Sequence, residues 1–226
     1  MTKLQPWCHI ATTAAVMVAT ACTPPPPDET GYVERLLEDR AIKDEMFTEG
    51  SDSPVPLDRR SWMLPIRYYE PAASYRVPAS LNIAEDRPTF EIPTSTGQLR
   101  IMQRVGTLEF MLNGETRTLS ALIELPIQDA TRLFVPFRDE TSGTETYPAG
   151  RYLDLDRTPT GIYDLDFNRA YHPTCYYNEE FDCPFPPPEN RLSTPVRAGE
   201  KLPLESERRI PIGLPKQPIS EPSGGN

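Results

Sequence analysis

The hydrophobic pattern of the chain changes from a helical to a strand-like period near residue 50. Between Tyr32 and Phe47, apolar residues recur every three or four positions. Oppositely charged residues stand four apart, as in Arg35 with Asp39 and Asp39 with Lys43. Such spacing places the apolar residues in one stripe and the charges on neighbouring turns. The pattern predicts a single amphipathic helix over this segment.

After Gly50, short runs of β-branched and aromatic residues alternate with Pro, Gly and Asn. Runs that repeat roughly every eight to twelve residues are typical of an antiparallel sandwich or barrel. We expect a mainly β domain with one N-terminal helix. The expected strands are Trp62 to Tyr68, Tyr75 to Asn82, Thr89 to Ile92, Leu99 to Gln103, Thr107 to Leu112, Glu115 to Leu125 and Arg132 to Arg138. Asn113-Gly114 predicts a type I′ turn between two of them.

A second hairpin is predicted over Gly150 to Asn168, turning between Arg157 and Gly161. Period-two alternation places leucine and phenylalanine on one face and acidic residues on the other. The apolar face would hold Leu153, Leu155, Leu165 and Phe167, and the polar face Asp154, Asp156, Asp164, Asp166 and Asn168. Like charges on neighbouring strands destabilise a sheet. Either a bound calcium ion compensates them, or Arg151, Arg157, Arg169 and more distant basic residues do; the absence of a calcium-loop motif favours the second reading.

The first 31 residues have the features of an export leader and a tether. Lys3 precedes an uncharged run from Ile10 to Ala21, which at about 12 residues is shorter than the roughly 20 needed to span a bilayer. Ala19-Thr20-Ala21-Cys22 resembles the lipobox of bacterial lipoproteins. We expect a signal peptide over 1–21, a palmitate-type acyl chain on Cys22 and a proline tether over 22–31. Cleavage and plain secretion is the alternative.

Charge and proline content limit the classes of partner. The chain has a formal net charge of -10 and no dense run of Lys or Arg, so we expect no nucleic-acid partner. An acidic surface gains nothing from anionic lipids, so membrane attachment would come from the lipid anchor. Thr23, where aspartate would favour inner-membrane retention, indicates an outer-membrane protein facing the periplasm. One domain over 32–202 and a proline-rich disordered tail over 203–226 complete the predicted organisation.

Cys175 and Cys183 are the cysteines left once Cys8 is cleaved off and Cys22 is acylated. In an oxidising compartment we expect them to form a disulfide that pins the irregular C-terminal segment, worth about 2 to 3 kcal/mol. A zinc site with His172 and a nearby carboxylate is the rival reading.

His172 is also the one histidine expected in the mature chain, so it is the only histidine available as a catalytic base. A structural role is favoured, because no nucleophile motif accompanies it.

Three ordered segments carry a resemblance to a known family. Lys43-Asp44-Glu45-Met46-Phe47 within 34–54, Phe137 to Leu155 and Asp166 to Lys201 resemble domain of unknown function family 1684. The resemblance implies a compact β-rich domain from about Glu34 to Lys201 and carries no assigned activity. Members of the family often have asparagine where this chain has His172, which disfavours a histidine-dependent reaction.

The family-like segments nominate a polar cluster for ligand binding. Its residues are Asp139, Thr141, Thr144, Tyr147, Arg151, Asp154, Asp166, Asn168, His172 and Asn190. They either line one cleft or stabilise turns and buried backbone, as Asp, Thr and Asn do locally.

Two functions remain open at this point. The first is a non-enzymatic envelope module that binds a small polar ligand, a cation or an envelope protein. The second is a hydrolase-like enzyme with Asp166 or Asp154 as base and Arg151 and Asn168 positioning an oxyanion or phosphate. The sequence assigns no cofactor.

Overall fold

A computed structural model describes residues 31–126 and 131–207. The expected signal peptide, Cys22, most of the proline tether and the tail beyond residue 207 lie outside these ranges. Within them, no helix has the length and apolar character needed to cross a membrane.

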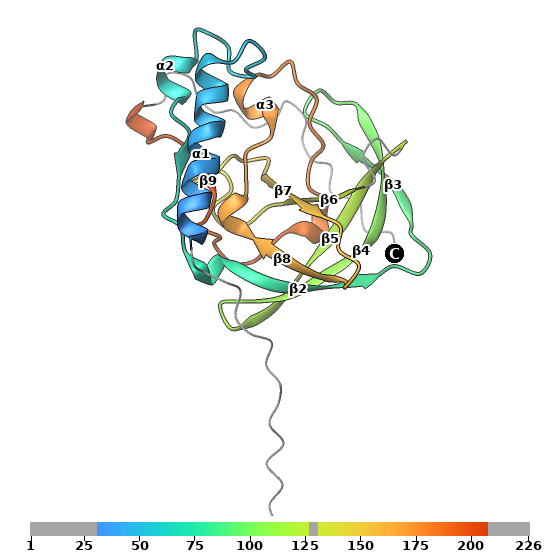
Figure 1. The fold of residues 1–226 in the computed structure, drawn as a ribbon. Helices are drawn as coiled ribbons and strands as arrows, with labels where there is room; N and C mark the ends of the chain where they lie inside the picture. The colour runs from blue at the N-terminus through green and yellow to red at the C-terminus, as the bar shows by residue number, and fades with distance from the viewer. Residues whose placement is uncertain (1–30, 127–130, 208–226) are drawn as a thin grey trace, which may run out of the picture.

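The domain is a nearly closed antiparallel barrel (Figure 1). Its strands are β2 (Arg76–Ile83), β3 (Thr89–Pro93), β4 (Leu99–Leu112), β5 (Glu115–Leu125), β6 (Arg132–Phe137), β7 (Arg151–Asp156) and β8 (Ile162–Asp166). Hydrogen-bonded neighbours follow the order β7-β6-β5-β4-β2-β8, and β3 pairs with β4 beside this path. The expectation of a small mainly β, barrel-like domain is therefore confirmed.

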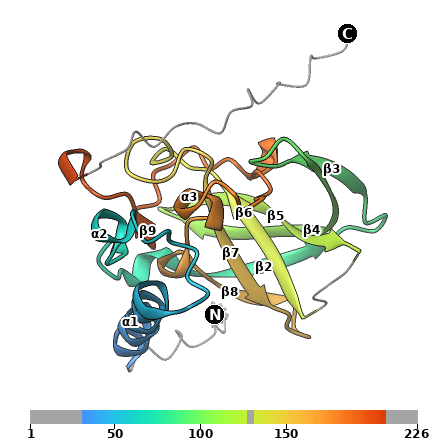
Figure 2. The same ribbon diagram turned by 90° about the horizontal axis from the view of Figure 1, so that it is seen from above.

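Helices and short strands cover one side of the barrel. α1 (Tyr32–Glu49) lies on the side where the small pair β1 (Arg67–Tyr68) and β9 (Glu200–Lys201) forms, while β3 and the adjoining part of β4 flare out on the opposite side (Figure 2). The remaining helices are short: α2 (Arg60–Met63), α3 (Thr174–Tyr177), and 3₁₀ turns η1 (Ala73–Tyr75), η2 (Phe167–Arg169), η3 (Pro188–Asn190) and η4 (Glu205–Glu207). The predicted helix over 32–47 is confirmed, but its predicted apolar stripe is not the buried face. Tyr32, Leu36 and Arg40 are buried, whereas the apolar residues Val33, Leu37, Ile42 and Met46 are exposed.

Alternation along the strands fills the barrel. Leu133, Val135 and Phe137 of β6 point inward together with Leu153 and Leu155 of β7, and all five belong to the main core cluster. At roughly 25 cal/mol per Å² of buried apolar surface, side chains of this size each contribute about 1.5 to 3 kcal/mol. The outward residues between them are therefore free to build a second layer.

The strands differ from the predicted set at two places. Leu99 to Gln103 and Thr107 to Leu112 are one strand, β4, because a bulge between Arg104 and Gly106 shifts its register instead of ending it. The expected strand Trp62 to Tyr68 is wrong except at Arg67–Tyr68, which is β1, because Trp62 and Met63 end α2 and residues 64–66 are irregular. The turn at Asn113-Gly114 is confirmed, with φ values of 53° and 80° that suit a type I′ turn.

The predicted pairing of the acidic hairpin is wrong. β7 and β8 form where expected, and Leu153, Leu155, Leu165 and Phe167 are buried. However, β7 pairs with β6, and β8 pairs with β2. The two strands occupy the ends of the sheet order and meet at an open seam without a ladder, because the sheet curls through all its strands before its edges approach.

Candidate functional site

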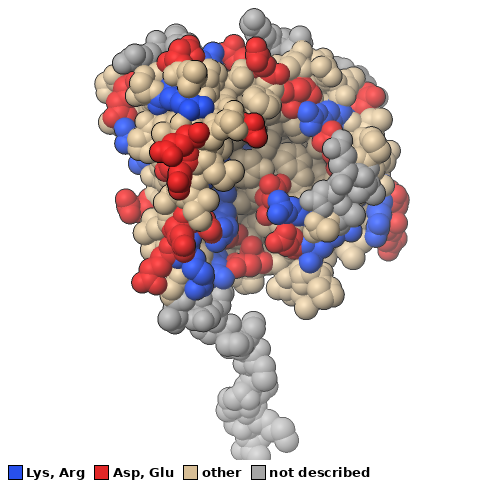
Figure 3. Space-filling model, turned by 45° about the horizontal axis from the view of Figure 1, so that its top comes forward, with Lys and Arg blue, Asp and Glu red and all other residues tan. Residues whose placement is uncertain are grey.

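A cleft of about 380 Å³ lies on the outer face of the barrel, between the sheet and the segment 171–184. We call it the tyrosine cleft. It is lined by Arg100, Met102, Leu122, Ile123, Glu124, Arg132, Phe134, Tyr152, Asp154, Tyr171, Thr174, Asp182, Cys183 and Pro184. A face of the molecule hollowed near its centre, with uncharged atoms at the base and both signs of charge around the rim, is visible in Figure 3.

The strand register brings the sheet side of the cleft together. Leu122 of β5 stands opposite Phe134 of β6, and Phe134 stands opposite Asp154 of β7. Their sequence neighbours point into the barrel, so these residues face outward. Leu122 packs with Ile92 and Met102 in a separate small cluster, which forms the apolar floor. Because the main core holds the backbone from the other side, the floor of the cleft is rigidly positioned.

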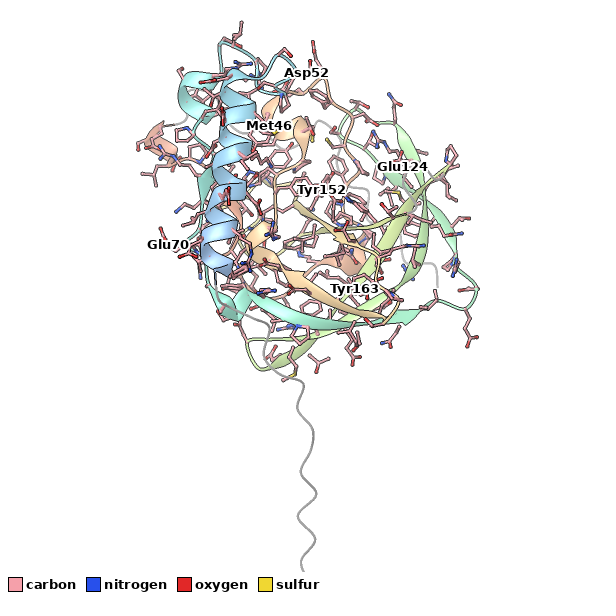
Figure 4. All side chains as sticks on the ribbon, in the orientation of Figure 1. Met46, Asp52, Glu70, Glu124, Tyr152 and Tyr163 are labelled. Atoms are coloured by element: carbon pink, nitrogen blue, oxygen red, sulfur yellow. The ribbon has the colours of Figure 1, made fainter. Side chains whose placement is uncertain are left out.

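Three aromatic rings form a corner in the cleft, which we call the aromatic corner: Phe134, Tyr152 and Tyr171. The rings of Phe134 and Tyr152 are 4.7 Å apart and inclined at 80°, and those of Tyr152 and Tyr171 are 5.8 Å apart at 86°. The Tyr152 hydroxyl donates to the carbonyl oxygen of Pro184, which fixes the ring against the covering segment. Burial raises the pKa of Tyr152 well above its ordinary value, so the hydroxyl stays a donor. Tyr152 lies near the centre of the domain and Glu124 toward the flared β3–β4 side (Figure 4).

Charged groups surround the aromatic corner unevenly. The Arg100 guanidinium pairs with Glu124 at 3.1 Å and Asp182 at 3.0 Å. Burial lowers the pKa of Arg100, but these two carboxylates outweigh it and leave the pKa above its ordinary value. Arg132 pairs with Asp156 at 3.2 Å. Asp154 accepts a hydrogen bond from the Tyr171 hydroxyl at 2.7 Å and has no Lys or Arg partner within 4.0 Å among the described residues.

The two late cysteines meet at the edge of this cleft. Both are buried, free thiols, and the Cys175 amide donates to the Cys183 sulfur at 3.2 Å. The hydrogen bond to Cys183, together with burial, raises the pKa of the Cys175 thiol. The structure confirms that the pair is close but not that it is oxidised, so the disulfide stays a prediction.

A buried network of hydrogen bonds and one ion pair joins three of the predicted ligand residues, Asp139, Thr141 and Arg151. The Arg151 guanidinium contacts Asp139 at 3.3 Å and donates to the carbonyl oxygens of Val196, Ala198 and Glu200. The Asp139 carboxylate also accepts from the Thr141 hydroxyl and the Val196 amide. Burial lowers the pKa of Arg151 from its ordinary value. These contacts hold the C-terminal segment against the barrel and leave no access to solvent.

His172 and Tyr147 lie in a second buried group. The Tyr147 amide donates to Nε2 of His172 at 3.3 Å, and the His172 amide donates to the Glu200 carboxylate at 2.7 Å. Glu200 also accepts from Lys43 of α1 at 2.6 Å and from the Tyr177 hydroxyl at 2.9 Å. Burial, only partly offset by Glu200, lowers the pKa of His172 to about 3. A neutral, enclosed imidazole of this kind is a structural group.

Asp166 and Asn168 fasten the N-terminal region to the end of β8. Asp166 accepts from the Tyr32 hydroxyl at 2.7 Å and from the Asn168 amide at 3.0 Å. The Asn168 side chain exchanges two hydrogen bonds with the backbone of Ala72. Both are buried, and neither lines the tyrosine cleft.

Asn190 substitutes for a strand partner. β5 and β6 share one pair, Leu122 with Phe134, because the strands separate beyond it. In the gap the Asn190 side chain accepts from the Ser120 amide at 2.7 Å and donates to the carbonyl oxygens of Ser120 and Pro136 at 3.0 Å and 2.8 Å. It is fully buried and satisfies backbone groups that no strand reaches.

The four aspartates weighed as calcium ligands surround a shallower pocket of about 260 Å³ at the seam between β7 and β8. Asp164 is held by Arg76 at 2.6 Å, Asp156 by Arg132, and Asp166 by Tyr32 and Arg169. Within residues 31–126 and 131–207, no three His, Cys, Asp or Glu side chains are grouped so as to hold a metal ion, and this includes His172 with the two cysteines. Arginine side chains thus compensate Asp156, Asp164 and Asp166, whereas Asp154 has a hydrogen bond from the neutral Tyr171 hydroxyl.

Of the predicted ligand residues, only Asp154 lines the tyrosine cleft. The sequence reasoning missed Phe134, Tyr152, Tyr171 and Arg100. A signal for two of them was present, because Phe134 and Tyr152 are large apolar residues on the outward face of strands whose inward face is already apolar. A strand that is apolar on both faces predicts a covering layer.

Comparisons with known proteins agree with this architecture. The family model described as "Protein of unknown function (DUF1684)" matches residues 64–201. The solution structure of an uncharacterized protein of Haloarcula marismortui is 37% identical to this chain, with a TM-score of 0.63, over 79% of this chain and 98% of that one. No curated protein matches the chain. The chain belongs to the DUF1684 family of proteins of unknown function.

Proposed function

We propose that this protein is a non-enzymatic binding module of the cell envelope, anchored through Cys22, whose domain holds a small amphipathic ligand in the tyrosine cleft. The observation that carries the proposal is the cleft itself. It combines an apolar floor, the aromatic corner and a mixed-charge rim in about 380 Å³. Small-molecule sites are concave, largely apolar and supplied with a few polar groups, and their volumes start at about 300 Å³.

The arrangement of reactive groups supports binding over catalysis. The groups of the alternative hydrolase mechanism do not all converge. Asp154 and Asp166 both line the pocket at the seam, but Arg151 and Asn168, which would position the oxyanion, are buried and bonded to backbone groups elsewhere. His172 is enclosed and neutral at physiological pH. A nucleophile and a base within hydrogen-bond reach of one reacting atom would be required for that mechanism.

The leader supports the envelope location. An uncharged run that ends in small residues before Cys22, followed by four prolines, fits a lipoprotein whose domain stands off the membrane surface on a stiff spacer. An extended proline spacer of this length rises about 3 Å per residue.

Ligand binding is tested by nuclear magnetic resonance titration of the labelled chain with a set of small charged and neutral aromatic and alkyl compounds. We expect shifts confined to residues of the tyrosine cleft, and their loss in Phe134→Ala. The matched control is Phe90→Ala, since Phe90 packs on the same small cluster as Phe134 but does not line the cleft. If no compound shifts the cleft residues, or if Phe90→Ala abolishes binding equally, the cleft is not a ligand site.

The anchor is tested independently by mass spectrometry of the protein from its native membrane fraction. A diacylglycerol-modified, acylated Cys22 as the first residue is the expected result. A soluble chain that starts at Met1, or that begins after Cys22 without lipid, would contradict the envelope part of the proposal.

A further inference from the structure

The charge balance inside the tyrosine cleft is uneven. Arg100 is held by Glu124, by the Asp182 carboxylate and by the Asp182 carbonyl oxygen, so its charge and donors are already engaged. Arg132 lies against Asp156, which is outside the lining. Asp154 is exposed and lacks a basic partner within 4.0 Å among the described residues, since its one hydrogen bond comes from a neutral hydroxyl. The unmatched charge of the cleft is therefore negative.

Aromatic faces stand beside this carboxylate. Tyr171 holds Asp154 through its hydroxyl, and its ring meets Tyr152 at 86°, so the two rings form adjoining walls next to the anion. Phe134 stands opposite Asp154 across the strand pair and meets Tyr152 at 80°. Ring faces are the negative ends of the aromatic quadrupole, and they attract cations within about 6 Å of the ring centre. A ring face of the aromatic corner would therefore attract the same sign of charge as the carboxylate does.

The fold already places one cation against a ring of the aromatic corner. The Lys43 ammonium lies 5.0 Å from the centre of the Tyr171 ring and 5.2 Å from that of Phe47. Its charge is matched by Glu200 at 2.6 Å, so it does not neutralise Asp154. Burial and the neighbouring Asp154 raise the pKa of Tyr171, which keeps the hydroxyl protonated and donating to the carboxylate.

We propose that the tyrosine cleft selects a small organic cation with an alkylated ammonium group, which Asp154 binds by charge and the aromatic corner by cation–π and apolar contact. This inference rests on the proposed binding function and names its ligand class. An alkylated ammonium suits the site because its surface is apolar and it carries a positive charge, so it contacts both the rings and the carboxylate. A metal ion would gain little from the aromatic rings and would need more oxygen ligands than Asp154 supplies.

Choline and its neutral carbon isostere 3,3-dimethylbutanol are the probes, titrated by calorimetry and nuclear magnetic resonance into the full chain at low ionic strength. We expect choline to bind roughly tenfold more tightly than the isostere. Asp154→Asn, which keeps the shape and an acceptor but removes the charge, is expected to abolish most of this difference. The control is Glu91→Gln, which removes an exposed carboxylate of β3 that neither lines the cleft nor pairs with a residue of its lining, and which is expected to change choline affinity less than twofold.

Stability is measured alongside, and Asp154→Asn is expected to melt with the wild type because Asp154 is exposed. Equal binding of choline and the isostere, preference for an anion such as benzoate, or an unchanged choline affinity in Asp154→Asn would overturn cation selection. In those cases, if neutral or anionic compounds bind and this binding is lost in Phe134→Ala, the cleft is still a ligand site and only the cation selectivity is refuted. If no probe of any charge shifts the cleft residues, the proposed function fails with it.

Discussion

Mild acid is predicted to destabilise this domain through one enclosed imidazole. His172 is buried among Tyr147, Tyr176 and Glu200, and its pKa falls from an ordinary 6.5 to about 3. Lys43 and Arg151 nearby further disfavour the charged form. The unfolded chain therefore takes up a proton on this residue at a pH where the folded chain does not, so stability is present above pH 6.5 and is lost as the pH falls toward 3.

The size of the effect follows from the two pKa values. At pH 7 about a quarter of the unfolded chains carry the proton on His172, and at pH 5 nearly all do, while the folded form stays neutral throughout. Linkage then gives a loss of about 2 kcal/mol in the free energy of unfolding between pH 7 and pH 5. Glu200, whose pKa is lowered, loses its contribution only as the pH falls below the unfolded value of about 4.5, so it adds little in this window.

The assay is urea denaturation at pH 7 and pH 5, followed by circular dichroism, for wild type and His172→Gln. Glutamine is long enough to place an acceptor near the position of Nε2 for the Tyr147 amide, but it cannot take up a proton. The variant is expected to lose about 2 kcal/mol less than the wild type between the two pH values. His9 is present in both proteins, so its contribution cancels. An identical pH dependence in the two proteins would refute the reasoning, because it would mean that His172 titrates alike in the folded and unfolded chains.

Three other features give predictions of comparable sharpness. Arg151→Met leaves the buried Asp139 carboxylate uncompensated and is expected to lower the free energy of unfolding, measured by urea denaturation, by about 3 to 5 kcal/mol. Adding Asp139→Leu should restore more than half of this loss, and no recovery would argue against an ion-pair origin. Asn190→Ala orphans three buried backbone groups and should cost about 3 kcal/mol, whereas a loss under about 1 kcal/mol would show that water replaces the side chain. Calcium or a chelator should leave the melting temperature unchanged, since the seam aspartates already have partners, and a clear upward shift with calcium would contradict this assignment.

Local spacing in the sequence determined most of the elements. The helix over 32–47, the runs that form β2 and β5 and the Asn113-Gly114 turn each depend on residues within a few positions of one another, and these elements are found as predicted. The charges of the helix pair elsewhere, however, because Asp39 contacts Arg169 and Lys43 contacts Glu200. The apolar faces of β7 and β8 were also determined in this way. β4 shows the limit of such reasoning, because a bulge looks like a strand end until the partner strand is known.

Only the tertiary structure decided which edges and surfaces meet. Pairing of β7 with β6, and not with β8, depends on the curl of the whole sheet, which no local pattern encodes. The same long-range packing buries Arg151, Asn168, His172 and Asn190. It also brings Tyr171 against the outward ring of Tyr152. The same types of polar residue occur in turns, in buried hydrogen-bond networks and in binding sites, so the sequence alone does not tell these roles apart. What separates them is burial and partner geometry, and these arise between segments as far apart as Lys43 and Glu200, which are separated by 157 positions.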